Sequence, residues 1–161
     1  MPLNPDVNYK YDHLGIPTKE VGPGERYVPA FKMFVSGYED SDFHVQWHRY
    51  EPDCELHPLI QTVPHVAFRV DDLDKAIEGR TVILGPYFPL EGYRVAMIED
   101  GGAPIEFVQT QLTEAQIIER ANVGDVKEPC ASATTNFVHL RGPRRSRWPY
   151  QIPGEGPVER G

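Results

Sequence analysis

The chain has 161 residues and a formal net charge of −8, with 40% hydrophobic and 25% charged residues. This length fits one domain or two small modules that share a core, and the acidic balance argues against a nucleic-acid partner. Cys54 and Cys130 form no CxxC pair, so we expect no disulfide framework. The start lacks the features of a signal peptide, and no run reaches about 18 apolar residues. We therefore expect a cytoplasmic protein with no membrane partner.

The first half of the chain predicts three strands, over residues 13–17, 31–36 and 43–50. Residues 18–29 hold two prolines and two glycines, so any helix there is short or replaced by a loop. Residues 51–61 are predicted to be a linker. Strand alternation places these side chains on one face of the third strand, with Val45 and Trp47 packed behind it: His44, Gln46, His48 and Tyr50.

The second half of the chain is more regular. It predicts a strand over 65–70, a helix over 71–79 and three strands over 81–84, 92–99 and 104–109. His65, Ala67 and Arg69 share one face of the first strand. Either Asp71 or Asp72 is the expected N-cap of the helix. The order strand, helix, strand, strand, strand echoes the first half, with one strand more.

The last third of the chain differs from the first two. Thr113 is the expected cap of a helix over 114–122, and little periodicity follows residue 123. A basic patch is formed by Arg141, Arg144, Arg145 and Arg147, beside Trp148 and Tyr150. The patch could bind an anion or nucleic acid, but in an acidic protein we expect it to pair with an acidic face. We therefore divide the chain into modules at 9–61 and 62–112 and an extension at 113–161.

The internal echo places polar side chains that can bind metal at matching points. His13 and His65 each open the first strand of their half, and Gln46 and Glu106 lie within the last strands. Two copies of one unit that pack face to face would bring all four together. Mixed nitrogen and oxygen ligands of this kind suit a divalent transition metal.

Two phrases carry a resemblance to a known family: His65-Val66-Ala67-Phe68-Arg69-Val70-Asp71-Asp72-Leu73-Asp74-Lys75-Ala76 and Gly102-Ala103-Pro104-Ile105-Glu106-Phe107. With the paired modules, they resemble the vicinal oxygen chelate (glyoxalase-like) superfamily over roughly residues 9–110. The resemblance implies an α+β fold in which two βαβββ-type modules form a metal-binding cup, followed by a C-terminal extension. It also implies a small-molecule substrate and a homodimer.

The resemblance implies His13, His65 and Glu106 as ligands of a divalent ion, which would be Zn, Ni, Co, Mn or Fe. Gln46 aligns best as the fourth ligand, although His48 lies on the same face and could replace it. The expected function is a metal-dependent isomerase or lyase that acts through an enolate-type intermediate. Glu106 would act as the base, His48 would orient the substrate, and Arg69 would bind a substrate carboxylate.

Two alternatives stay open at the level of sequence. The subset of two histidines and one glutamate resembles the iron site of extradiol dioxygenases, which would require Gln46 to stay off the metal. A binding module of the same fold would use the cup without catalysis. The fold alone does not distinguish these functions.

Overall fold

The computed structural model describes residues 2–122. Cys130 and the predicted basic patch at 141–147 lie outside the described residues. The elements are β1 (Tyr9–Pro17), β2 (Arg26–Val28), η1 (Pro29–Phe31), β3 (Met33–Ser36), β4 (Val45–Tyr50), α1 (Pro58–Thr62), β5 (His65–Val70), α2 (Leu73–Ile77), β6 (Thr81–Leu90), β7 (Tyr93–Asp100), β8 (Ala103–Thr110) and α3 (Glu114–Asn122).

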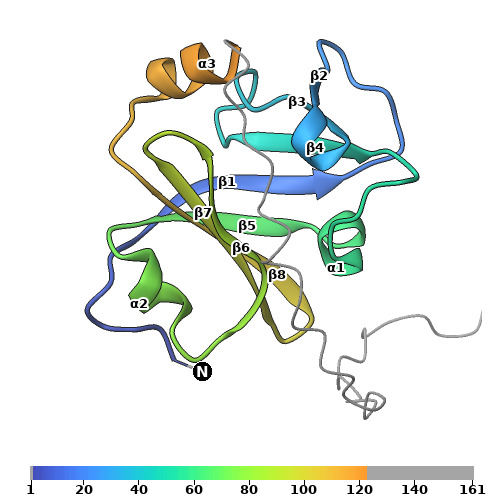
Figure 1. The fold of residues 1–161 in the computed structure, drawn as a ribbon. Helices are drawn as coiled ribbons and strands as arrows, with labels where there is room; N and C mark the ends of the chain where they lie inside the picture. The colour runs from blue at the N-terminus through green and yellow to red at the C-terminus, as the bar shows by residue number, and fades with distance from the viewer. Residues whose placement is uncertain (1, 123–161) are drawn as a thin grey trace, which may run out of the picture.

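All eight strands join one mixed sheet in the order β2-β3-β4-β1-β5-β8-β7-β6 (Figure 1). Each half repeats one pattern, because its first strand pairs in parallel with its last, and the other two pairings are antiparallel. The halves meet where β1 pairs with β5 in antiparallel fashion. The expected α+β class with a repeated unit is therefore confirmed, whereas the expectation of one strand fewer in the first half is wrong, because β2 is the missing strand.

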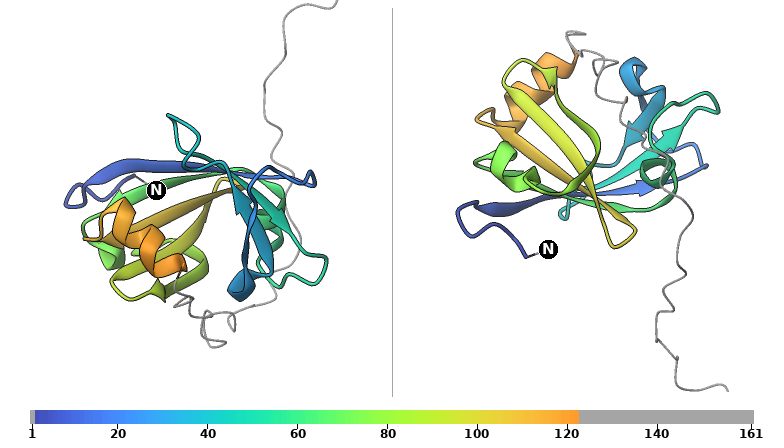
Figure 2. Two further views of the ribbon diagram at one scale, coloured as in Figure 1. Left: turned by 90° about the horizontal axis from the view of Figure 1, so that it is seen from above. Right: turned by 60° about the horizontal axis from the view of Figure 1, so that its bottom comes forward.

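The sheet curls into a cup. Figure 2 shows the strands of the two ends of the sheet, β2–β3 and β6–β7, turned toward each other across β1 and β5. Side chains from both ends line one hollow, including Arg26 and Val35 from one end and Leu90 and Tyr93 from the other. Ile117 of α3 lines the same hollow, so this helix lies at the mouth of the cup.

The convex face of the second half carries the main core. Leu73 of α2 packs on Ile98 and Phe107, and Val7 from the N-terminal segment completes the cluster. Asp72 caps α2 by accepting a hydrogen bond from the backbone N–H of Lys75. The burial of this apolar face holds the strands that position the second half of the site.

Within residues 2–122, no such helix covers the convex face of the first half. There a cross-strand row of Tyr27, Phe34 and Arg49 takes its place, with Arg49 lying 4.0 Å from the centroid of the Phe34 ring and paired with Glu25 at 2.6 Å. The expectation that Trp47 packs behind the cup is only partly met, because Trp47 is on this face but 43% exposed.

Residues 51–61, the expected linker, lie between the two halves and also contain the start of α1, with His57 as its N-cap and its buried Ile60 packed against Leu84. One further expectation needs correction. The strand expected to end at Gly85-Pro86 continues to Leu90 as β6. It can do so because β6 is an edge strand, where proline costs no ladder hydrogen bond.

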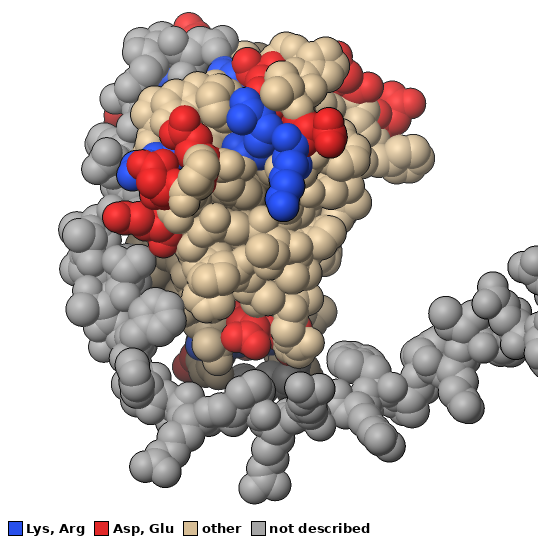
Figure 3. All heavy atoms as spheres, turned by 90° about the vertical axis from the view of Figure 1, so that its right-hand side faces the viewer, with Lys and Arg blue, Asp and Glu red and all other residues tan. Residues whose placement is uncertain are grey.

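Charges are mixed on the face drawn in Figure 3, where a small group of basic side chains is flanked by acidic ones above a broad uncharged area. The described basic side chains on this face form no continuous basic surface. Among the described helices, none has the length and apolar character needed to cross a bilayer.

Candidate metal centre

Two cross-strand rows build the site. In the first row, Gln46 of β4 stands opposite Gly15 of β1, which in turn stands opposite His65 of β5. In the second row, Glu106 of β8 stands opposite Ala67, which stands opposite His13. Each row therefore has one small residue between two polar ones, and Gln46 occupies in the first half the register position that Glu106 occupies in the second.

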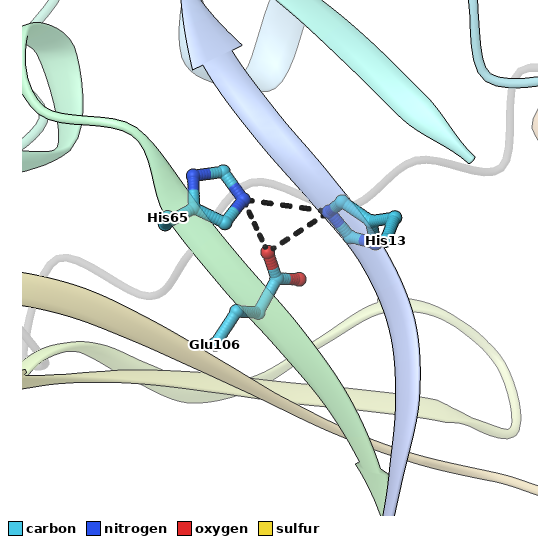
Figure 4. Close-up of side chains that lie close together, drawn as sticks. All are labelled: His13, His65 and Glu106. Carbon is cyan, nitrogen blue, oxygen red and sulfur yellow. Dashed lines mark hydrogen bonds and ion pairs between the residues drawn. The ribbon is translucent and has the colours of Figure 1, made fainter. Parts of the chain in front are cut away.

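The second row and His65 converge on one point (Figure 4). The Oε2 atom of Glu106 lies 3.1 Å from Nε2 of His65 and 3.5 Å from Nε2 of His13, and the two nitrogens are 3.4 Å apart. Donor atoms that share a divalent ion at about 2.1 Å lie about 3.0–3.4 Å from one another in tetrahedral or octahedral geometry. The three atoms therefore fit one face of a metal coordination sphere.

Asp12 fixes His13 from behind. The pairing of β1 with β5 shifts between Tyr11 and His13, so Asp12 is the extra residue of a bulge. A bulge turns adjacent side chains toward the same face, and the Asp12 carboxylate reaches Nδ1 of His13 at 2.8 Å. A carboxylate at this nitrogen directs the Nε2 lone pair to a metal. The matching Nδ1 of His65 has no partner among the described residues.

The charges of Asp12, Glu106 and the two histidines shift the pKa values within the triad. Burial opposes protonation of His13, but its hydrogen bonds to Asp12 and Glu106 raise its pKa to about 9. Burial alone would raise the pKa of Glu106, yet its hydrogen bonds to His13 and His65 hold the pKa well below its usual range. Glu106 is thus an anion in a largely buried site, and protonated His13 compensates its charge there; a divalent ion that bound the three side chains would displace that proton.

Gln46 and His48 line the same hollow as the triad but form a chain of their own. Nε2 of His48 lies 2.7 Å from Oε1 of Gln46, and its Nδ1 lies 3.2 Å from the hydroxyl of Tyr50. Burial, followed by the neighbouring His65 and His13, lowers the pKa of His48 to about 3. Neutral His48 donates to the amide oxygen of Gln46, which keeps a second lone pair for another partner.

Arg69, expected to bind a substrate carboxylate, lines the outer part of the cup but pairs through Nε with Asp12. His44, expected on the concave face, lies instead beside Tyr38, with ring centroids 4.6 Å apart, and its Nδ1 bonds the carbonyl of Asp12. Its positive φ of 50° places it in the turn before β4 rather than in the strand.

Sequence reasoning did not identify Asp12, Gly15 or Ala67 as parts of the site. Regular alternation would point Asp12 away from the cup, and only an acid next to a candidate ligand hints at its role. Gly15 and Ala67 carry no polar group, so their function as spacers becomes visible only with the register of the rows.

No family model and no curated protein matches the chain. One solved structure that matches is the hypothetical protein BH1468 from Bacillus halodurans C-125, with 19% identity, a TM-score of 0.44 and coverage of 65% of this chain and 96% of that chain. Another is methylmalonyl-CoA epimerase from Mycobacterium tuberculosis, with 18% identity, a TM-score of 0.42 and coverage of 66% and 91%. The strand order of this chain, with two repeated units curled into one cup, is the arrangement that the resemblance to the vicinal oxygen chelate superfamily implies.

Proposed function

We propose that this protein is a metal-dependent isomerase or lyase that removes a proton from a small oxygen-chelating substrate. The observation that carries the proposal is the convergence of His13, His65 and Glu106 at separations of 3.1–3.5 Å in an accessible hollow. A bound divalent metal would supply Lewis-acid stabilisation of negative charge on the substrate oxygens. Gln46 would complete the ligand set through its amide oxygen, held by His48.

Glu106 is the proposed base. One of its oxygens faces both histidines, while the other carries no contact to them in Figure 4. The carboxylate would take a proton from the carbon beside the substrate carbonyl, and the electrons of that C–H bond would move onto the carbonyl oxygen to give an enolate. Return of the proton to carbon completes an isomerisation. Arg69 would bind the carboxylate end of the substrate. The homodimer stays a prediction from the resemblance.

Metal content and proton removal test the proposal in sequence. We expect elemental analysis of protein purified without chelator or histidine tag to give close to one divalent ion per chain, and the His65→Ala variant to lose it. We then expect the metal-loaded protein to exchange the C3 hydrogens of pyruvate for deuterium in D2O, measured by proton NMR. Glu106→Gln should slow this exchange about 100-fold or more. Full exchange in that variant, measured at equal metal content, would rule out Glu106 as the base.

One observation favours a second candidate, an Fe(II) dioxygenase. His13, His65 and Glu106 converge by themselves, and as two histidines and one carboxylate they match the metal-binding face of such enzymes. Iron in the purified protein, together with oxygen consumption in the presence of a catechol, would select this function over the isomerase.

A further inference from the structure

The hollow that the triad lines, here called the inner hollow, has a volume of about 170 Å³. Apart from the triad, Gln46 and His48, its walls are aliphatic and aromatic side chains together with Pro89. The aliphatic walls are Met33, Leu56, Ile60, Leu84, Val95 and Met97. Among the described residues, Glu106 is the only Asp, Glu, Lys or Arg that lines it. A ligand group that enters the inner hollow must therefore be uncharged, because an unpaired charge there would be desolvated without compensation.

The other side of the triad differs in its charged groups. There an outer hollow of about 230 Å³ has apolar walls as well, but two arginines, Arg26 and Arg69, line it together with the acids Asp12, Glu39 and Glu114. The guanidinium of Arg69 pairs with Asp12 through Nε, and its remaining N–H groups can serve a second acceptor. Arg69 can therefore serve an anionic group on this side of the triad, whereas no Lys or Arg among the described residues lines the inner hollow.

Size limits the apolar group. A dry protein cavity of about 150 Å³ binds benzene, so the inner hollow suits a group up to one six-membered ring or a branched alkyl chain. Resting on the proposed function, we propose that the substrate is a 2-oxo acid with a branched-alkyl side chain. Its keto oxygen and one carboxylate oxygen face the triad, its second carboxylate oxygen lies toward Arg69, and its alkyl group fills the inner hollow against Leu56, Ile60 and Leu84.

This assignment is tested by measuring the affinities of a series of 2-oxo acids for metal-loaded protein by isothermal titration calorimetry. Each buried methylene is worth roughly fourfold in affinity, so 4-methyl-2-oxopentanoate should bind about 10- to 50-fold more tightly than pyruvate. It should also bind at least about 10-fold more tightly than 2-oxoglutarate, whose side chain is similar in length but charged. Leu56→Gln places an amide in the half-buried wall and should reduce the first ratio to about threefold or less. The exposed Val82→Gln should leave the ratio unchanged.

Oxalate separates the two proposals, because it has two chelating oxygens and no side chain. In one outcome, oxalate binds the metal-loaded protein but not the metal-free protein, while 4-methyl-2-oxopentanoate binds with no higher affinity than pyruvate. That result would overturn this inference and leave the proposed function standing. The inference would also be overturned if 2-oxoglutarate bound more tightly than 4-methyl-2-oxopentanoate. It would likewise be overturned if the Leu56→Gln variant kept the full affinity ratio between 4-methyl-2-oxopentanoate and pyruvate. If oxalate and the 2-oxo acids bind with the same affinity to metal-loaded and metal-free protein, the proposed function is contradicted as well.

Discussion

Between the proposed metal ligands of each cross-strand row lies a residue with almost no side chain. Gly15 separates Gln46 from His65, and Ala67 separates Glu106 from His13. In a sheet, directly opposite side chains stand side by side on one face, so any larger residue at these positions would occupy the space into which the ligands lean. The spacers thus decide whether a metal can be shared by three strands.

Gly15→Ala tests this at the position with least room. A Cβ on Gly15 would lie 2.1 Å from Cε1 and 2.4 Å from Nε2 of His65, whose ring is 2% exposed and has little freedom to move aside. We expect the variant to fold, with a loss of about 1–3 kcal/mol in unfolding free energy from overpacking. Its metal affinity, measured by calorimetry, should fall at least about 10-fold.

The matched control is Ala67→Gly, at the equivalent point of the other row. This change enlarges the gap instead of filling it, so it should lower stability by roughly 1 kcal/mol while the ligands keep their places. Equal metal affinity in Gly15→Ala and the unchanged protein would show that the spacer has no role.

At the scale of the elements, the strands and helices with a regular sequence pattern were the ones that could be predicted. The strand over 65–70 was predicted with its observed bounds, because strict alternation and a preceding proline mark it, and the helix over 114–122 was predicted from Thr113 as its cap. The three-residue β2 was missed because prolines and glycines surround it and it has too few residues to show a period. It forms by pairing with β3, a contact that sequence alone does not show.

The site was predictable to the same degree. His13, His65 and Glu106 follow from a repeat of regular strands, and the structure brings their ligand atoms together. Asp12 required knowledge of the bulge in β1, which depends on how this strand registers with β5 and so on the tertiary fold.

The bulge gives a prediction of its own. Asp12→Asn keeps the shape of the side chain but removes the charge that holds Nδ1 of His13 and Nε of Arg69. Loss of such a supporting carboxylate typically weakens metal binding 10- to 100-fold. We expect that change in a competition assay with a colorimetric chelator. Asp74→Asn is the control, because it also removes the charge of an aspartate paired with an arginine, here on the exposed side of α2. An equal effect of both variants would assign the loss to general charge.

The ion pair between Glu25 and Arg49 near the edge of the first half makes part of the stability of the protein sensitive to acid. Arg49 lowers the pKa of Glu25 to about 2 from 4.5. A depressed pKa means that the contribution to stability is present above pH 4.5 and is lost as the pH falls from there toward 2. In urea unfolding we therefore expect wild type to lose more stability than Glu25→Gln between pH 6 and pH 3. Glu20→Gln, for which no ion pair occurs in the described part of the chain, should follow wild type.

On the scale of the whole molecule, the triad joins the two repeated units. His13 comes from the first half, while His65 and Glu106 come from the second, and the halves otherwise meet mainly along β1 and β5. A metal that binds only when both halves are in place stabilises the native state as a whole. Folding and metal binding are then linked, and the linkage can be measured without a known substrate.

Metal removal should therefore lower the melting temperature. At a free metal concentration of 100 times the Kd, binding adds about 2.7 kcal/mol to the unfolding free energy, which for a chain of this size corresponds to roughly 5–10 °C in Tm. We expect this difference between metal-loaded and chelator-treated protein in scanning calorimetry. His13→Ala leaves both second-half ligands in place but breaks the link between the halves, so most of the difference should disappear. A full metal-dependent rise in Tm in that variant would place the ion within the second half alone and would contradict a centre shared by the two units.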